Sequence, residues 1–155
     1  MRRNTASQRK TITTRLFLDA SVVFSASYSE KGASREIILR GIRGQLIVVV
    51  SRYVLKEVRV NLEEKAPHAV EAYQELVTLL SPEIADAPSL SELREEATYI
   101  NLTDAPIVAA AARARVDYLV TLDRKHLLSD PKVAQRSGLK IVTPDQLMAI
   151  FKDEV

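Results

Sequence analysis

Four of the chain's 20 acidic residues stand where carboxylates could do chemistry together: Asp19, Glu57, Asp104 and Asp123. Asp19 and Asp123 each end an apolar run. Glu57 and Asp104 have no lysine or arginine three or four positions away that would form a helical ion pair. Carboxylates brought together repel one another and raise one another's pKa, and a hard divalent cation such as Mg²⁺ or Mn²⁺ removes that repulsion. We therefore interpret the four acids as a candidate metal centre.

Each of these acids also has an ordinary structural explanation. Asp104 directly precedes an alanine-rich helical segment, where an N-cap is the default role and stabilises by about 1 kcal/mol. An aspartate at the end of a strand, such as Asp19 or Asp123, is often only a turn residue. Glu57 taken alone is typical of a solvated helix face. The metal interpretation depends on the set of four and not on any single member.

Continuous apolar runs predict the strands that would position these acids. Four runs are typical of strands buried on both faces, at residues 15–19, 46–50, 118–122 and 140–143. Ligands of open parallel sheets bind beyond the carboxyl ends of the strands. If the first and third of these strands are neighbours, Asp19 and Asp123 therefore face one crevice.

Helical spacing of apolar residues fills most of the chain between these strands. We predict helices at residues 20–28, 33–43, 52–65, from Pro67 to Leu80, at 90–98, at 104–115 and from Pro144 onward, with a loop at 82–88. A capping box formed by Ser89 and Glu92 supports the helix at 90–98. Strands that alternate with helices predict an α/β fold, with a parallel sheet covered by helices on both faces.

Composition excludes several classes of protein. A length of 155 residues with 46% hydrophobic and 27% charged residues is ordinary for one globular domain. The longest apolar run, Ile107 to Ala112, is far shorter than the ~20 residues that span a bilayer. The absence of cysteine excludes zinc-thiolate sites, thiol nucleophiles and disulfides. We expect a cytoplasmic protein with no membrane partner.

The net charge of +2 conceals an uneven distribution. Residues 1–14 contain four basic side chains and no acid, so the rest of the chain is slightly acidic. We interpret residues 1–14 as a basic, flexible arm and residues 15–155 as a single domain.

Four stretches that contain the acids resemble, in order, the motifs of the PIN-domain family of metal-dependent nucleases. They are residues 17–22 (FLDASV), 53–58 (YVLKEV), 104–111 (DAPIVAAA) and 117–127 (DYLVTLDRKHL). Each motif is weak by itself, but four in the right order across residues 15–151 make a fairly specific signal. The sequence departs at Lys125, where many members of the family have a further acid.

The resemblance implies a three-layer α/β/α sandwich around a parallel sheet of about 4–5 strands. It implies Asp19, Glu57, Asp104 and Asp123 as catalytic residues and as ligands of one or two Mg²⁺ or Mn²⁺ ions. It also implies hydrolysis of phosphodiester bonds in RNA. Many small members of the family are toxins paired with an antitoxin, and they often form homodimers.

Around this site the residue types suggest supporting roles. Ser21 and Thr121 could orient ligands or a water, or could bond only to the backbone. Basic residues that would contact RNA are Arg52, Lys56, Arg124 and Lys125. The two histidines, His68 and His126, are interpreted as surface or packing residues and not as general bases.

Two other functions remain open from the residues alone. The first is a catalytically inactive PIN-like protein that binds nucleic acid or acts as a scaffold. The second is a phosphoryl-transfer enzyme with an aspartate at a strand end, although Ser21 occupies the position of the second aspartate that a haloacid-dehalogenase-type site requires. No glycine-rich phosphate-binding loop is present among the four glycines.

Overall fold

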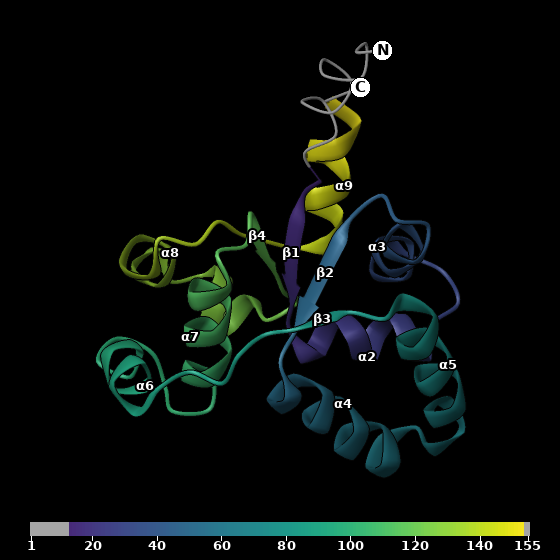
Figure 1. Ribbon diagram of the computed structural model, residues 1–155, viewed down its shortest axis with the longest axis horizontal. Helices are drawn as coiled ribbons and strands as arrows, with labels where there is room; N and C mark the ends of the chain where they lie inside the picture. Colours follow the sequence, from purple (N-terminus) through teal and green to yellow (C-terminus); the bar gives the residue numbers. More distant parts are fainter. Residues whose placement is uncertain (1–12, 154–155) are drawn as a thin grey trace, which may run out of the picture.

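The computed structural model describes residues 13–153, in which five parallel strands form a central sheet (Figure 1). The strands are β1 (Arg15–Leu18), β2 (Ile47–Val50), β3 (Glu83–Ile84), β4 (Tyr118–Val120) and β5 (Ile141–Val142). Their order across the sheet is β3-β2-β1-β4-β5. β1 and β4 are therefore neighbours, which is the condition for Asp19 and Asp123 to face one crevice.

Helices cover both faces of the sheet, so the three-layer α/β/α prediction is confirmed. In Figure 1 one group lies to the right of and below the strands: α2 (Ala20–Tyr28), α3 (Ala33–Ile42), α4 (Arg52–Lys65) and α5 (Val70–Leu80). The other group lies to the left: α6 (Leu90–Glu96), α7 (Ala105–Ala114) and α8 (Pro131–Ser137). A short 3₁₀ turn, η1 (Pro67–Ala69), precedes α5, and α9 (Pro144–Asp153) packs against α3.

The fifth strand lies inside the predicted loop at 82–88, and that prediction is wrong at Glu83–Ile84. β3 is only two residues long and both are exposed, so no apolar run marks it. Hydrogen bonds to other strands hold β3 in place. The Ala85 N–H, directly after β3, donates to the Val50 carbonyl of β2 at 2.8 Å. Arg15 of β1 also donates two hydrogen bonds of 2.8 Å to the Glu83 carboxylate.

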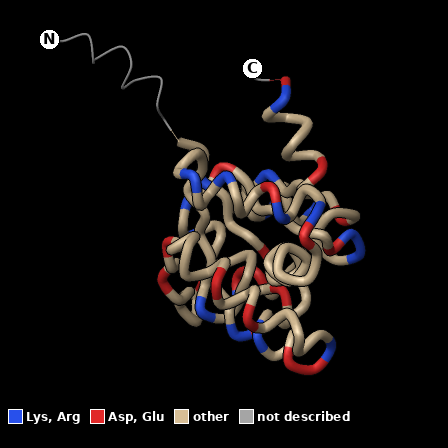
Figure 2. The backbone as a smooth tube through the Cα atoms, turned by 90° about the vertical axis from the view of Figure 1, so that its right-hand side faces the viewer, with Lys and Arg blue, Asp and Glu red and all other residues tan. Residues whose placement is uncertain are grey.

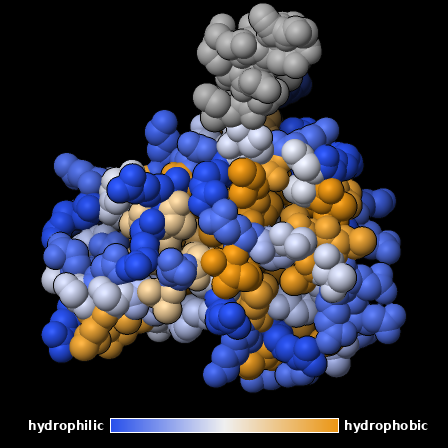
Figure 3. Space-filling view, viewed as in Figure 1, coloured by the Kyte–Doolittle hydropathy of each residue, from blue (hydrophilic) through white to orange (hydrophobic). Residues whose placement is uncertain are grey.

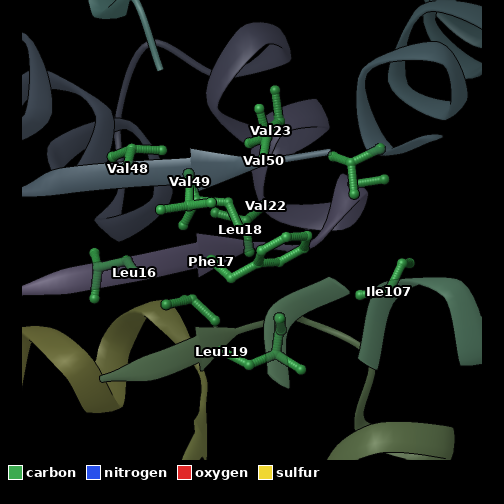
Figure 4. Close-up of a cluster of buried hydrophobic side chains, with 14 of the residues drawn as sticks. Leu16, Phe17, Leu18, Val22, Val23, Val48, Val49, Val50, Ile107 and Leu119 are labelled. Carbon is green, nitrogen blue, oxygen red and sulfur yellow. The ribbon is translucent and has the colours of Figure 1, made fainter. Parts of the chain in front are cut away.

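The core explains why the strands read as continuous apolar runs. Phe17 in β1 is paired with Val49 in β2 and with Leu119 in β4, and all three side chains are fully buried. Figure 4 shows these residues together, with Val22 from α2 and Ile107 from α7 in the same cluster. Because helices cover both faces of the sheet, neither face meets water, and apolar residues do not alternate with polar ones along these strands.

The segment after β4 contains two helices for which the sequence made no prediction. Residues Arg124–Leu128 form one turn of π-helix, η2, and α8 follows. β4 ends at Val120 and not at the predicted residue 122, and residues 121–123 connect it to η2. Single π-helical turns are rare and are often found at functional sites. This turn follows Asp123 directly.

Two further observations concern the surface. In the part of the chain that is described, no helix is long and apolar enough to cross a membrane. Figure 2 shows basic and acidic residues interspersed along the chain. Residues 1–12 of the predicted basic arm lie outside the described residues.

Candidate metal centre

The end of β1 holds the Asp19 carboxylate in one orientation. Its Oδ1 accepts a hydrogen bond from the Ala20 N–H at 2.8 Å, which caps α2. Its Oδ2 accepts from the Ser21 hydroxyl at 2.9 Å and from the Thr121 hydroxyl at 2.7 Å. The residue is only 7% exposed. A buried carboxylate with this many donors is rigidly placed at the edge of the sheet.

Thr121 connects the ends of β1 and β4. Its hydroxyl is fully buried, donates to Asp19 and accepts a 2.9 Å hydrogen bond from the Asp123 N–H. Ser21 similarly donates to Asp19 and accepts from the Leu122 N–H at 3.0 Å. Each hydroxyl therefore bonds both to a backbone N–H and to the Asp19 carboxylate, so neither bonds only to the backbone.

Asp104 does not cap α7, although it stands at the N-cap position. Its side chain accepts no hydrogen bond from the N–H groups of the helix. Instead its Oδ2 accepts from the Asn101 side-chain amide at 2.9 Å, while the Asp104 N–H donates to Asn101 Oδ1 at 2.9 Å. The N-cap role that is the default for an aspartate at this position is therefore wrong for Asp104. Burial raises the pKa of Asp104, and the charges of Asp123 and Asp19 raise it further against the opposing hydrogen bond from Asn101.

Glu57 approaches the same place from α4. Ser51 caps this helix by accepting a 3.1 Å hydrogen bond from the Val54 N–H, and the helix then continues without a break past Glu57. Burial raises the pKa of Glu57, and the charges of Asp19 and Asp104 raise it further. Within residues 13–153 no lysine or arginine forms an ion pair with this carboxylate.

All four acids line one open pocket of about 470 Å³. Ser21 also lines it, and Asn61 and Lys65 of α4 extend it beyond Glu57. These last two residues were not predicted from the sequence. They follow Glu57 at intervals of four residues, which is the helical spacing that could have revealed them.

His126 is exposed, as expected for a surface residue, but its imidazole also lies beside two of the acids. His126 Nδ1 lies 3.5 Å from Asp123 Oδ2 and 3.9 Å from Asp104 Oδ2. One ligand atom from each of the three residues lies within 4.8 Å of the others. Asp123 causes this placement, because its Oδ1 accepts a 3.0 Å hydrogen bond from the His126 N–H within η2. The sequence signal that could have revealed this contact is the position of His126, three residues after the capping Asp123.

Asp104, Asp123 and His126 together fit a divalent cation. They supply carboxylate oxygens and one imidazole nitrogen at separations that a single ion can bridge. The raised pKa values of Glu57 and Asp104 have a common origin in burial and mutual repulsion, which a bound cation would relieve.

The basic residues predicted to contact RNA are not in this pocket. All four are exposed: Arg52, Lys56, Arg124 and Lys125. Arg52 lines a second pocket at the start of α4, and Arg124 and Lys125 belong to η2, directly after Asp123. None of the four lines the acidic pocket.

Comparison with known proteins gives the family. The family model described as "PIN domain" matches residues 15–125 of the 155-residue chain. The chain belongs to the PIN domain family. The match begins with β1 and ends in η2, so it includes all four acids of the PIN domain's pocket. No match to a curated protein was found.

Solved structures support the fold of this PIN domain. VapBC2 from Rickettsia felis, bound to a DNA fragment from its promoter, is similar with a TM-score of 0.63 over 84% of this chain and 98% of that chain. PAE2754 from Pyrobaculum aerophilum has a TM-score of 0.61 over 90% of both chains. FitAcB from Neisseria gonorrhoeae has a TM-score of 0.56 over 83% and 97%. Each is 16% identical, so the likeness concerns the fold.

Proposed function

We propose that this PIN domain is a metal-dependent endoribonuclease that hydrolyses phosphodiester bonds in RNA. The observation that carries the proposal is the convergence of Asp19, Glu57, Asp104 and Asp123 on one pocket. Within residues 13–153 none of the four has a lysine or arginine as an ion-pair partner. A pocket of this charge repels phosphate unless a cation is bound, so we assign metal and substrate to the same site.

We assign Asp19 and Asp104 as principal ligands of Mg²⁺ or Mn²⁺, with Glu57 and Asp123 completing the set. His126 is an added nitrogen donor beside Asp104 and Asp123. When bound, the cation supplies the positive charge that activates a water nucleophile and offsets the charge of the phosphate. Ser21 and Thr121 are positioning residues, because their hydroxyls fix the Asp19 carboxylate.

The RNA backbone also needs positive charge outside the metal centre. Lys65 lines the far end of the pocket, and we assign it a phosphate contact. Arg124 and Lys125 are exposed on η2 beside Asp123, and Lys56 is exposed on α4 next to Glu57. Their side chains can bind neighbouring phosphates of a strand that crosses the acidic pocket.

The test is cleavage of a panel of structured and unstructured RNAs in Mn²⁺ or Mg²⁺. We expect wild-type protein to cut at least one RNA, EDTA to stop cleavage, and Asp19→Asn to lower the rate roughly 100-fold or more. Asp145→Asn is the matched control, because Asp145 is exposed at the start of α9 and does not line the pocket. Circular dichroism must show that both variants are folded.

Cleavage that persists in Asp19→Asn and in EDTA would contradict the proposal. RNA binding that weakens with salt, without cleavage in either metal, would instead support the alternative of an inactive nucleic-acid-binding protein.

We further propose that the protein is the toxin of a toxin–antitoxin pair and acts as a homodimer. The similarity to VapBC2 and FitAcB supports a protein partner of this kind. Expression of the wild-type chain in a bacterium should arrest growth, and expression of Asp104→Asn should not. Growth arrest by both forms, or by neither, would contradict the toxin proposal. Light scattering of the purified chain tests the homodimer.

A further inference from the structure

A second pocket, of about 290 Å³, lies beside the acidic one. It opens at the carboxyl ends of β2 and β3, while the acidic pocket lies at the ends of β1 and β4. In Figure 1 the chain after β3 crosses in front of the end of the sheet toward α6, and this crossing forms one wall. Figure 3, viewed from the same side, shows hydrophobic surface over the middle of this face. Both pockets thus belong to the edge of the sheet where α/β proteins bind ligands.

Tyr53 stands between the two pockets. Its ring lines the second pocket and is 40% exposed. Its hydroxyl donates a 3.1 Å hydrogen bond to the Thr103 carbonyl, directly before Asp104. Burial raises the pKa of Tyr53, and the charges of Glu57, Asp104 and Asp19 raise it further. The hydrogen bond holds this ring in place beside the proposed metal centre.

Helices α4 and α7 each contribute residues to both pockets. Arg52 and Tyr53 of α4 line the second pocket, and Glu57 on the next turn lines the acidic one. Pro106 of α7 lines the second pocket, and Ile107 lines the acidic one. A linear ligand can therefore pass from one pocket to the other across Tyr53 without leaving the surface.

The lining of the second pocket suits a flat heterocycle. Ile84, Ala87, Pro88 and Pro106 contribute apolar lining, and Arg52 contributes a charged side chain. The N–H groups of Asp86 and Ala87 donate no hydrogen bond to any residue in the range 13–153. These two donors, with the Asp86 carboxylate as an acceptor, can pair with the polar edge of a base. An exposed tyrosine ring is a stacking platform that every base can use.

We propose that this second pocket is a nucleobase subsite, which holds the base of a nucleotide next to the phosphate in the acidic pocket. Tyr53 stacks on the base, and Arg52 contacts the adjoining phosphate. The inference rests on the proposed ribonuclease function and narrows its preferred substrate to unpaired RNA, because a base in a duplex enters the pocket only at the cost of unpairing and unstacking.

The test measures binding of the four nucleoside 5′-monophosphates and of ribose 5-phosphate, which lacks a base. Ligand-observed NMR on the full chain gives the affinities, and amide shifts of residues 84–88 locate the binding. We expect at least one nucleotide to bind more tightly than ribose 5-phosphate. Tyr53→Ala should weaken that nucleotide between about 5-fold and about 150-fold, the range for loss of one base–aromatic stack.

Three further variants separate stacking from general damage. Ala87→Phe fills the pocket at an exposed position and should abolish the preference for a base. Tyr53→Phe keeps the ring and should stay within about 3-fold of wild type, because the stacking face is unchanged. Tyr28→Ala removes another exposed tyrosine, 57% exposed on α2, and should have no effect.

Equal binding of ribose 5-phosphate and every nucleotide, or unchanged base binding in Ala87→Phe, would overturn the subsite. Either result leaves the ribonuclease proposal standing if wild type cuts RNA and Asp19→Asn does not. Conversely, base binding at residues 84–88 without cleavage of any RNA would overturn the ribonuclease proposal and leave a nucleotide site. Cleavage of duplex RNA at the rate of single strands would contradict the unpaired substrate.

Discussion

At the scale of single residues, the acids of the pocket oppose the stability of the fold in the absence of metal. Asp19 is satisfied by three donors, but Glu57 and Asp104 have raised pKa values because burial and like charges disfavour their ionised forms. Residues with such pKa values cluster at functional sites. A bound cation would relieve this repulsion between carboxylates, and so would offset the loss of stability that they cause.

Glu57→Gln should therefore stabilise the metal-free protein at neutral pH. A carboxyl with a raised folded-state pKa costs stability above that pKa, and the cost disappears as pH falls toward the ordinary value of 4.5. We expect a melting temperature about 1–3 °C above wild type at pH 7 and no difference near pH 4. Glu63→Gln on the same helix is the control, because Glu63 is exposed and paired with Arg59. A lower melting temperature for Glu57→Gln at pH 7 would contradict this prediction.

His126→Ala should change which metal the site prefers. Imidazole is a better ligand for Mn²⁺ than for Mg²⁺, which strongly favours oxygen. We expect Mn²⁺ affinity measured by calorimetry to fall roughly 10-fold and Mg²⁺ affinity to change less. Nitrogen coupling in the electron spin-echo spectrum of bound Mn²⁺ should disappear in the variant. His68→Ala, the other histidine, lies outside the pocket and should leave both affinities and the spectrum unchanged.

At the scale of elements, the site depends on where helices and strands begin and end. β1 ends at Leu18 and β4 at Val120, so both strand ends deliver an aspartate to the same edge. α4 delivers Glu57 in its second turn, and η2 brings His126 back toward Asp123. The apolar strand pattern and the helix spacing were sufficient to predict most of these elements. β3 and η2 were not predictable in this way, because β3 is only two residues long and η2 is a single irregular helical turn.

The cap of α4 gives a test at this scale. Ser51 is buried and its hydroxyl accepts from the Val54 N–H, so Ser51→Ala leaves that donor without its partner. We expect the free energy of unfolding in urea to fall by about 1 kcal/mol, with an unchanged m-value. Ser51→Thr, which keeps a hydroxyl acceptor, should lose much less. Equal losses in both variants would show that packing at this position matters more than the cap.

At the scale of the whole molecule, a small net charge of +2 combines an acidic pocket with basic surroundings. Arg52, Lys56, Arg124 and Lys125 are exposed, and the acidic pocket is lined by four carboxylates. A bound divalent cation would offset part of the negative charge of these four carboxylates and so reduce their repulsion of phosphate. Residues 15–155 as one domain, preceded by residues 1–14 as a basic arm, remain our proposal for the whole chain.

RNA binding should accordingly depend on salt through identifiable residues. With Asp104→Asn as a non-cleaving background, we expect the affinity for single-stranded RNA to fall with rising salt. Lys125→Ala should reduce the slope of log affinity against log salt by roughly 0.7, the value for one lost phosphate contact. Arg94→Ala removes an exposed charge on α6, away from the pocket, and should leave the slope unchanged. An equal slope for Lys125→Ala and its background would remove Lys125 from the RNA path.

The sequence alone determined the α/β class, most of the helices and strands, and the four acids, because these follow from local periodicity and from residue type. It also determined the family resemblance, since the order of motifs along a chain is linear information. Only the tertiary structure decided that Asp104 is not a cap, that His126 lies between two carboxylates, and that Tyr53 separates two pockets. These are contacts between segments distant in sequence or set by an irregular turn. Local spacing does not encode such contacts, because they arise from how whole elements pack.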